Sequence, residues 1–304
     1  MSLARFRYFE KVARLGSIRE AAEVLHVAPS AISRQIAHLE AEFGAELFER
    51  QARGMRLTPA GEIVLRSARN LLDGMDQARS ALDDLRGLRR GHVRLWTVEG
   101  MLSDFVYPVL AQFSAAHPAV TFDLLIGSSD QLVDRLLEDE ADLAVVFNPP
   151  AHRGIATLGE MRDPLLAIMR PDHEAAAAGR LSLAELARWQ IALPDATFGM
   201  RHVINEAAAA ARLHLQPRLV TNSVEALRGF ARTGMGVALL TRMAAQRDLD
   251  QGQLAAVPLR DRLLRTTRTR ICARRDRRLP AVVHALARAF GQAATTVCAV
   301  ADAA

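Results

Sequence analysis

The sequence predicts an α + α/β protein: a small helical domain, one long helix and a large α/β domain. Three observations support this fold class. Apolar residues recur at helical spacing in the first 57 positions, a heptad repeat follows, and short β-type runs alternate with helical patterns after Gly91. With 304 residues, 50% of them hydrophobic, the chain is long enough to bury two or three cores.

Bulk composition narrows the class of protein. The net charge of +5, with a sequence pI of about 10.1, permits a polyanionic partner without requiring one. Two cysteines, Cys272 and Cys298, exclude a disulfide scaffold and are typical of a reducing compartment. Charges recur from the N-terminus onward, unlike in a signal peptide, and prolines interrupt the longest uncharged stretch, residues 105–122. We therefore expect a cytoplasmic protein without a membrane span.

The N-terminal segment is expected to form short packed helices. Ser17 and Glu20 have the spacing of a capping box, so a second helix should occupy residues 18–25. A short turn then leads into a third helix, which should open at residue 29 or 30, run to about residue 43 and end at Gly44.

These two helices and their turn have the geometry of a helix-turn-helix, whose second helix enters the major groove of DNA. No carboxylate occurs from Val24 to Leu39 or from Arg50 to Gly61, so two surfaces are free of negative charge. Hydroxyl, amide and guanidinium groups there can bond to phosphates and base edges. The candidate DNA-binding residues are Ser30, Ser33, Arg34 and Gln35 on the helix, and Arg50 and Arg53 near a basic wing. The alternative is an ordinary pair of helices in an all-α fold.

A long helix should follow two short extended pieces around Gly54. Thr58 is placed as its N-cap and Pro59 as its first residue, and the helix should run to about residue 88. A 4-3 apolar spacing over three repeats favours a dimerising coiled coil over an amphipathic helix that lies on a core. The seam consists of Val64, Ala68, Leu71, Met75, Ala78, Leu82 and Leu85.

The remainder, residues 91–304, alternates strand-like runs with helical patterns, which indicates parallel α/β sheets in one large domain or in two lobes. Helical patterns cover residues 101–115 and 129–139. The strand-like runs are "HVRLWT", "VTFDLLI", "DLAVVF", "PLLAIM", "QIAL", "PRLVT", "GVALLT" and "TRTRICA".

The N-terminal segment "FEKVARLGSIREAAEVLHVAPSAISRQIAHLEAEFGAELFERQARGMRLTPAGE" resembles the winged helix-turn-helix of LysR-type transcriptional regulators. The matching elements are Gly16-Ser17, Ala21-Ala22, Leu25, Ser30, Ser33-Arg34-Gln35-Ile36, Leu39-Glu40, Gly44, Leu47-Phe48, Arg50, Leu57-Thr58 and Ala60-Gly61. The resemblance extends over the whole chain and implies a winged helix-turn-helix, a long dimerisation helix and a two-lobed, periplasmic-binding-protein-like α/β domain.

The resemblance divides the chain as follows: 1–57, DNA-binding domain; 58–88, linker and dimerisation helix; 91–304, effector-binding domain, with lobe one at about 91–161 and 267–304 and lobe two at about 162–266. It implies a homodimer that assembles to a tetramer on double-stranded DNA. It also implies a small-molecule effector between the lobes, which shifts the dimers, and contact with RNA polymerase if the protein is an activator.

Ligands of such two-lobed domains bind at the carboxyl ends of strands, near the N-termini of helices. The candidate effector-binding residues follow the strand-like runs: Thr97, Glu99, Gly100, Ser128, Ser129, Phe147, Asn148, Thr197, Phe198, Asn222 and Ser223. Ser128 and Asn222 have an alternative role as helix caps, and the two phenylalanines have an alternative role as core residues.

Glu99 is unusual, because the loop that contains it carries a neutral or small residue in members of the family with carboxylate effectors. An acid there would repel an anion. Two interpretations are open: Glu99 points to solvent, or the effector is cationic or rich in hydroxyl groups.

No catalytic constellation is present. The sequence has no G-x-S-x-G, P-loop or G-x-G-x-x-G motif, and its nine histidines show no metal-ligand spacing. We therefore expect a regulator that is not an enzyme and has no cofactor or metal. The alternatives are a constitutive DNA-binding oligomer without an effector, and a soluble α/β protein that binds small molecules.

Overall fold

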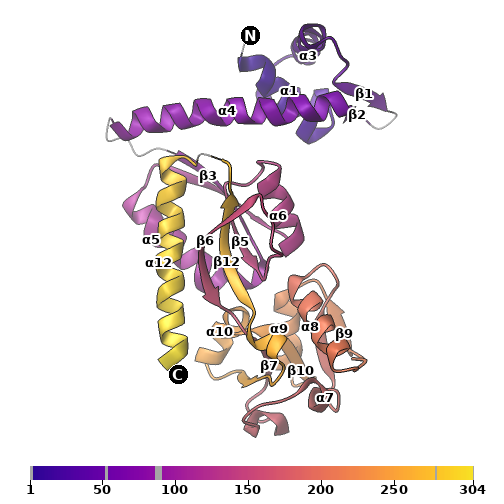
Figure 1. Cartoon of the computed structure of the whole chain (residues 1–304), viewed down its shortest axis with the longest axis vertical. Coiled ribbons are helices and arrows are strands. Elements are labelled where there is room, and N and C mark those ends of the chain that lie inside the picture. The colour runs from indigo at the N-terminus through magenta and orange to yellow at the C-terminus, as the bar shows by residue number, and fades with distance from the viewer. Residues whose placement is uncertain (1–2, 52–53, 86–90, 278, 304) are drawn as a thin grey trace. The chain divides into compact units, whose positions relative to one another are not determined.

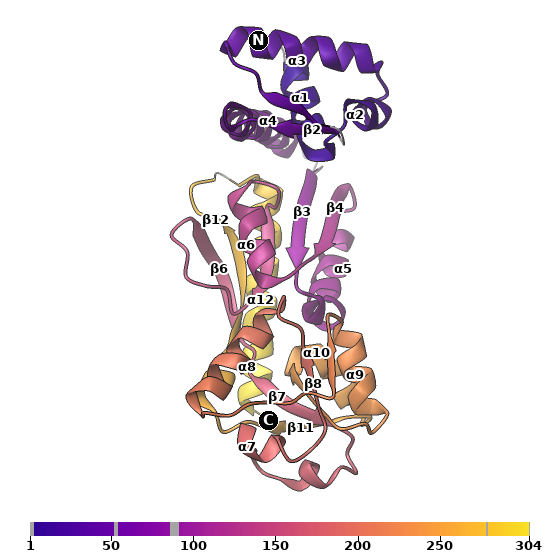
Figure 2. The same ribbon diagram turned by 90° about the vertical axis from the view of Figure 1, so that its right-hand side faces the viewer.

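The computed structural model describes the chain except for residues 1–2, 52–53, 86–90, 278 and 304. The chain divides into two compact units, Met1–Gly87 and Leu88–Ala304. Figures 1 and 2 show the elements of both units from two directions. Among the described helices, none is long and apolar enough to cross a membrane.

The first unit is helical with one β-hairpin. Its described elements are α1 (Leu3–Leu15), α2 (Ile18–Leu25), α3 (Pro29–Phe43), β1 (Phe48–Gln51), β2 (Gly54–Leu57) and α4 (Pro59–Leu85). The strands pair antiparallel, with Phe48 opposite Leu57, so they form a wing beside the helices.

Local capping chemistry sets the ends of these helices. The Ser17 hydroxyl accepts a hydrogen bond from the backbone N–H of Glu20 (3.3 Å), and α2 begins at the next residue after Ser17. Gly44 ends α3 in the left-handed conformation at φ 64°. The Thr58 hydroxyl accepts from the N–H of Gly61 (2.9 Å) at the start of α4. These starts and stops confirm the sequence prediction.

The core of the first unit corrects the predicted dimer seam. Val64 and Ala68, the first two seam positions, are buried in the core of their own unit. The N-terminal turns of α4 pack against α1, so this part of the helix covers its own domain and cannot face a partner. The core is formed by Phe6, Phe9, Val12, Ala21, Ala22, Ile32, Ile36, Leu39, Leu47, Phe48, Val64, Leu65 and Ala68.

The second unit contains two sheets, each with its own helices. The first lobe comprises β3 (Gly91–Thr97), the 3₁₀ turn η1 (Glu99–Met101), the π-helical turn η2 (Leu102–Val106), α5 (Tyr107–Ala116), β4 (Val120–Ile126), α6 (Ser129–Leu137), β5 (Leu143–Phe147), β6 (Ile155–Arg162), β12 (Arg268–Arg274) and α12 (Ala281–Ala303).

The second lobe lies between β6 and β12 in the chain. It comprises β7 (Leu165–Met169), the 3₁₀ turn η3 (Glu174–Ala177), α7 (Leu183–Leu186), β8 (Ile191–Pro194), α8 (Gly199–Ala210), β9 (Leu219–Thr221), α9 (Val224–Arg232), β10 (Val237–Thr241), α10 (Arg242–Asp250), β11 (Ala255–Pro258) and α11 (Arg262–Arg265).

Both sheets are mixed, which corrects the expectation of parallel sheets. The strand orders are β4-β3-β5-β12-β6 and β11-β7-β10-β8-β9. The pairs β3–β4, β3–β5, β10–β8 and β8–β9 are parallel, whereas β12 runs antiparallel to β5 and β6, and β7 runs antiparallel to β10 and β11. The direction of β12 differs because the chain reaches this strand from the other lobe, without a crossover helix within its own sheet.

Helices cover both faces of the first sheet. Leu143 and Val145 of β5 belong to the core with α5 and α12, while Ala144 and Val146 belong to the core with α6. Figure 1 shows α12 running alongside this sheet, where it packs on β6, β3 and β12. Burial on both faces explains why the central strands are continuous apolar runs.

Two strands, β6 and β11, were not predicted from the sequence, and each forms one edge of its sheet. Exposed residues interrupt β6, so it has no continuous apolar run. The predicted helix over residues 101–115 is divided in the structure into η1, η2 and α5. Pro108, which lacks a backbone N–H, lies in the first turn of α5, where helical N–H groups have no partner.

Two chain crossings connect the lobes, and they are hydrogen-bonded to each other. The backbone N–H of Asp163, between β6 and β7, donates to the carbonyl of Thr267, between α11 and β12 (3.1 Å). The Thr267 hydroxyl donates to the carbonyl of Asp163 (2.7 Å). These two connecting segments form the hinge between the lobes, and Asp163 of the hinge also lines a pocket.

Candidate functional site

The first candidate site is the exposed start of α3. Its inner face is fixed by Ile32, Ile36 and Leu39 in the core, so Ser30 and Arg34 are exposed on the opposite side. Ser33 and Gln35 are half-buried beside them. No side chain caps the helix N-terminus, because Ala28 occupies the N-cap position. The predicted hydroxyl and guanidinium groups therefore share one accessible helix end.

Gln35 has a partner that the sequence did not reveal. The Nε of Arg5 donates to the Oε1 of Gln35 (2.9 Å), and Arg5 also approaches Glu42 (3.4 Å). Arg5 lies on α1, 30 positions away, and no local pattern links it to α3. It adds a positive charge beside the predicted recognition helix and holds the Gln35 side chain in place.

The wing residues are placed only in part. Arg50 belongs to β1, but its side chain and the whole of Arg53 lie outside the described residues. Arg56 on β2 is exposed and contributes a positive charge to the described part of the hairpin.

Beyond its buried N-terminal turns, α4 exposes the later seam residues. Leu71 and Met75 are each 39% exposed, and Ala78 is exposed as well. The side chains of Leu82 and Leu85 lie outside the described residues. Apolar side chains at 4-residue spacing on one exposed face are typical of a helix that packs on another chain.

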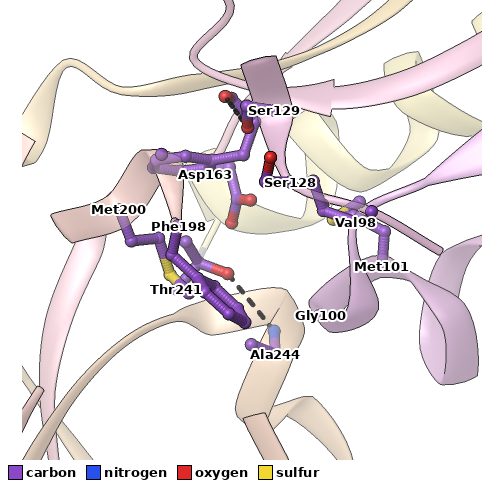
Figure 3. A pocket seen from close by; sticks show the side chains of 13 residues that line it. Val98, Gly100, Met101, Ser128, Ser129, Asp163, Phe198, Met200, Thr241 and Ala244 are labelled. Atoms are coloured by element: carbon purple, nitrogen blue, oxygen red, sulfur yellow. Dashed lines mark hydrogen bonds between the residues drawn. The ribbon is translucent and has the colours of Figure 1, made fainter. Parts of the chain in front are cut away.

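The second candidate site is a pocket between the two lobes of the second unit (Figure 3). It contains about 390 Å³ of empty space, part of it open to solvent. Its lining is Val98, Gly100, Met101, Gly127, Ser128, Ser129, Phe147, Asp163, Phe198, Gly199, Met200, Thr241 and Ala244. Five predicted effector-binding residues are among them: Gly100, Ser128, Ser129, Phe147 and Phe198.

Two of these five also have the capping or packing roles that were the alternative interpretation. Ser128 caps α6 by accepting from the N–H of Gln131 (3.3 Å), while the Gln131 side chain accepts from the N–H of Ser128 (3.0 Å). The Ser129 hydroxyl donates to the carbonyl of Phe147 (2.8 Å), which joins α6 to the end of β5. Phe147 is itself part of the core of the second lobe.

Six other predicted residues do not line this pocket. Thr97 is fully buried beneath it. Asn148, Thr197 and Asn222 are exposed, and Thr197 bonds to Asp195. Ser223 caps α9. These residues do follow strands, but the side chain of Ser223 is used as a helix cap and that of Thr197 in a local turn.

Glu99, the sixth, neither points to solvent nor lines the pocket. Its carboxylate accepts from the backbone N–H of Val224 (2.9 Å) and from the hydroxyl of Ser223 (3.4 Å). The acid in the first lobe therefore occupies the N-terminus of α9 in the second lobe, where the helix dipole favours a negative charge. In the structure, these hydrogen bonds of Glu99 connect the two lobes.

Asp163, the one ionisable side chain among the described lining residues, was not predicted from the sequence. Burial raises the pKa of its carboxyl from 3.8 to about 6, against the opposing effects of Thr269, Thr241 and the Met243 backbone. Asp163 lies in the hinge immediately after β6. Because β6 was not recognised as a strand, its end could not be read as a strand end.

The other missed lining residues, Val98, Met101, Gly127, Gly199, Met200, Thr241 and Ala244, are mostly apolar or small. Several of them are next in sequence to a predicted residue. The position after a strand therefore identified the lining loops, but it did not identify which side chains of those loops line the pocket. In the described part of the chain, no group of His, Cys, Asp or Glu residues could hold a metal ion.

Comparisons with known proteins agree on one family. A family model described as "LysR substrate binding domain" matches residues 86–295, and one described as "Bacterial regulatory helix-turn-helix protein, lysR family" matches residues 3–62. The "HTH-type transcriptional activator CmpR" of a Synechocystis species is 28% identical over 256 residues, which cover 84% of each chain.

Solved structures show the same fold. A full-length OxyR variant from Pseudomonas aeruginosa superposes with a TM-score of 0.72 at 21% identity, covering 95% of this chain and 94% of that one. Full-length CbnR in complex with its target DNA superposes with a TM-score of 0.61 at 22% identity, covering 96% and 100%.

Proposed function

This chain belongs to the LysR family of bacterial transcriptional regulators, and from that premise we propose how its described residues bind DNA, pair two chains and sense an effector. As in the rest of the family, the N-terminal domain binds DNA and the C-terminal domain binds an effector. The residue assignments below are our proposal.

The start of α3 reads the operator in the major groove. The supporting observation is that Ser30 and Arg34 are exposed near the N-terminus of α3. The helix contains no Asp or Glu before Glu40. Arg34 binds a guanine edge or a phosphate, and Ser30 and Ser33 bind phosphates or bases. Gln35, held by Arg5, offers its amide nitrogen to the same groove.

The exposed face of α4 pairs two protomers. It begins at Leu71, where the helix leaves the core of its own domain. Pairing places two copies of α3 on one duplex, so that each meets one half-site. Two such dimers form the tetramer, which acts in the cytoplasm and contacts RNA polymerase where the protein activates transcription.

An effector in the pocket between the lobes shifts the placement of the dimers on DNA. It does so by binding more tightly to one quaternary state than to the other. The proposed activity is regulation without catalysis and without a metal or organic cofactor. An effector that leaves DNA footprint, DNA bend and transcription all unchanged would contradict this mechanism.

The test of DNA recognition compares Arg34→Ala with the wild-type chain on the DNA upstream of its own gene and on a scrambled fragment. We expect the variant to lose 1–3 kcal/mol of binding free energy, on the order of one guanine contact, measured by fluorescence anisotropy at two salt concentrations. The wild-type protein should bind the native fragment more tightly than the scrambled one, and its affinity for both fragments should be higher at low salt.

Arg180→Ala is the matched control, because it removes the same exposed charge from the second unit. If Arg34→Ala and Arg180→Ala bind the native fragment equally well, the assignment of α3 as the recognition helix is wrong.

A further inference from the structure

The buried carboxylate of Asp163 lines the interlobe pocket, and one of its two oxygens accepts no hydrogen bond. Asp163 is 1% exposed, and its Oδ2 accepts from the Thr269 hydroxyl (2.8 Å). Thr241 and the Met243 backbone approach the carboxyl, but neither forms a hydrogen bond of good geometry to Oδ1, which has no partner among the described residues. Figure 3 shows the Asp163 side chain among the other lining residues, between Ser129 and Thr241.

The rest of the lining supplies no counter-charge. The described lining residues include no Lys, Arg or His, and most are apolar or small, such as Val98, Met101, Phe198 and Met200. The hinge threonines beside Asp163 are neutral too. A carboxylate in such surroundings lowers the stability of the fold unless a cation pairs with it or a donor forms a hydrogen bond to its free oxygen.

The polar groups at the rim of the pocket are already used within the chain. The Ser129 hydroxyl donates to Phe147, and the Thr241 hydroxyl accepts from the N–H of Ala244 (3.3 Å). Glu99 fills the N-terminus of α9, which would otherwise attract an anionic ligand from this side of the cleft. Among the buried lining side chains that the structure describes, Asp163 is therefore the one with an unpaired acceptor.

We propose that Asp163 binds the ammonium group of a small, largely apolar amine, and that this amine is the effector. The inference rests on the proposed function, in which the interlobe pocket holds the effector. The ligand cation provides the missing donor for Oδ1.

The pocket limits the size of the amine. Its enclosed free volume is about 30 Å³, which is room for about two water molecules, so the lobes must part to admit a ligand and only a small amine suits the site. The thioether side chains of Met101 and Met200, together with Phe198, suit a compact hydrocarbon body such as one ring or a short branched chain. A carboxylate of the same size would meet Asp163 without any cation in the lining.

The experiment uses the full chain and three probes of equal size: benzylamine, benzyl alcohol and benzoate. Binding is measured by isothermal titration calorimetry and by thermal shift at pH 7.5. We expect benzylamine to bind and raise the melting temperature, benzyl alcohol to bind at least ten-fold more weakly, and benzoate not to bind. Cyclohexylamine and isopentylamine test other hydrocarbon bodies with the same ammonium group.

Asp163→Asn is the decisive variant, since it keeps the shape and the acceptor for Thr269 while removing the charge. It should weaken benzylamine binding at least ten-fold. Asp134→Asn is the matched control, because Asp134 is an exposed acid on α6 that does not line the pocket, and it should bind benzylamine like the wild-type chain.

Three results would overturn the inference: benzylamine bound equally by Asp163→Asn, benzoate bound in preference to the amines, or no amine bound at all. DNA binding of the same preparations is measured in parallel. Preserved operator binding without amine binding removes only this inference, whereas loss of operator binding in the wild-type chain contradicts the proposed function itself.

Discussion

At the scale of single residues, Asp163 shows how a site can lower the stability of the fold that contains it. Its pKa is raised from 3.8 to about 6 by burial, so the folded state binds the proton more tightly than the unfolded state does. At neutral pH the carboxylate therefore destabilises the folded state. A shift of this size corresponds to about 3 kcal/mol, and the penalty disappears as the pH falls through about 6 toward 4.

Asp163→Asn is accordingly expected to raise the melting temperature at pH 7.5, and the gain should shrink steadily between pH 7 and pH 4. Thermal unfolding followed by circular dichroism across this range measures the effect. Asp134→Asn should show no comparable pH-dependent gain, since that side chain is exposed. An Asp163→Asn chain that is less stable than the wild type at pH 7.5 would show that the carboxylate has a stabilising partner.

At the scale of elements, α4 combines two roles that one heptad pattern could not separate. The sequence correctly predicted a long helix from Pro59 with apolar residues on one face. It could not show that Val64 and Ala68 are covered by the chain's own helices while Leu71 and Met75 are left exposed. Coverage depends on where α1 lies, and α1 is more than 40 residues earlier in the chain.

Replacing Leu71 and Met75 together by Asp should weaken the dimer roughly 100-fold, or about 2.7 kcal/mol, because four charges would be buried at the pairing face. Light scattering after size-exclusion chromatography reports the mass. Arg66→Asp places the same charge on an exposed position on the far side of α4 and should remain dimeric. A double variant that keeps its dimer mass would place the dimer interface elsewhere.

At the scale of the whole effector-binding unit, direct contacts between the lobes border the pocket. Glu99 of η1 caps α9, and His202 of α8 lies 3.9 Å from Asp130 of α6. Gly199 lies so close to Ser129 that an added Cβ would be 2.7 Å from its Oγ. These contacts hold the lobes together around the pocket, so entry of a ligand requires some of them to open.

Glu99→Ala should lower the free energy of unfolding by about 1 kcal/mol, because α9 loses a carboxylate at its N-terminus and the lobes lose a connection. Glu99→Gln keeps the hydrogen-bond acceptor and should lose less. Urea denaturation of the full chain gives both values, with Glu206→Ala, an exposed acid on α8, as a control. Equal stability of Glu99→Ala and the control would mean that this contact contributes nothing to lobe closure.

The sequence by itself determined the helix starts of the first unit, the helix-turn-helix, the central strands and the two-part architecture. These features depend on local capping chemistry and on apolar periodicity, which are legible over a few residues, as the Ser17 cap and the apolar run of β5 show. Two of the four edge strands, β6 and β11, were not predicted, since exposed or half-buried residues interrupt their apolar runs.

Only the tertiary structure decided which strand-end side chains meet. It directed Glu99 onto α9, placed Arg5 beside Gln35, and brought Asp163 from the hinge to the pocket wall. Each of these contacts joins residues at least 30 positions apart or depends on how two lobes close. Sequence periodicity describes which face of an element is buried, but it carries no information on which distant element covers that face.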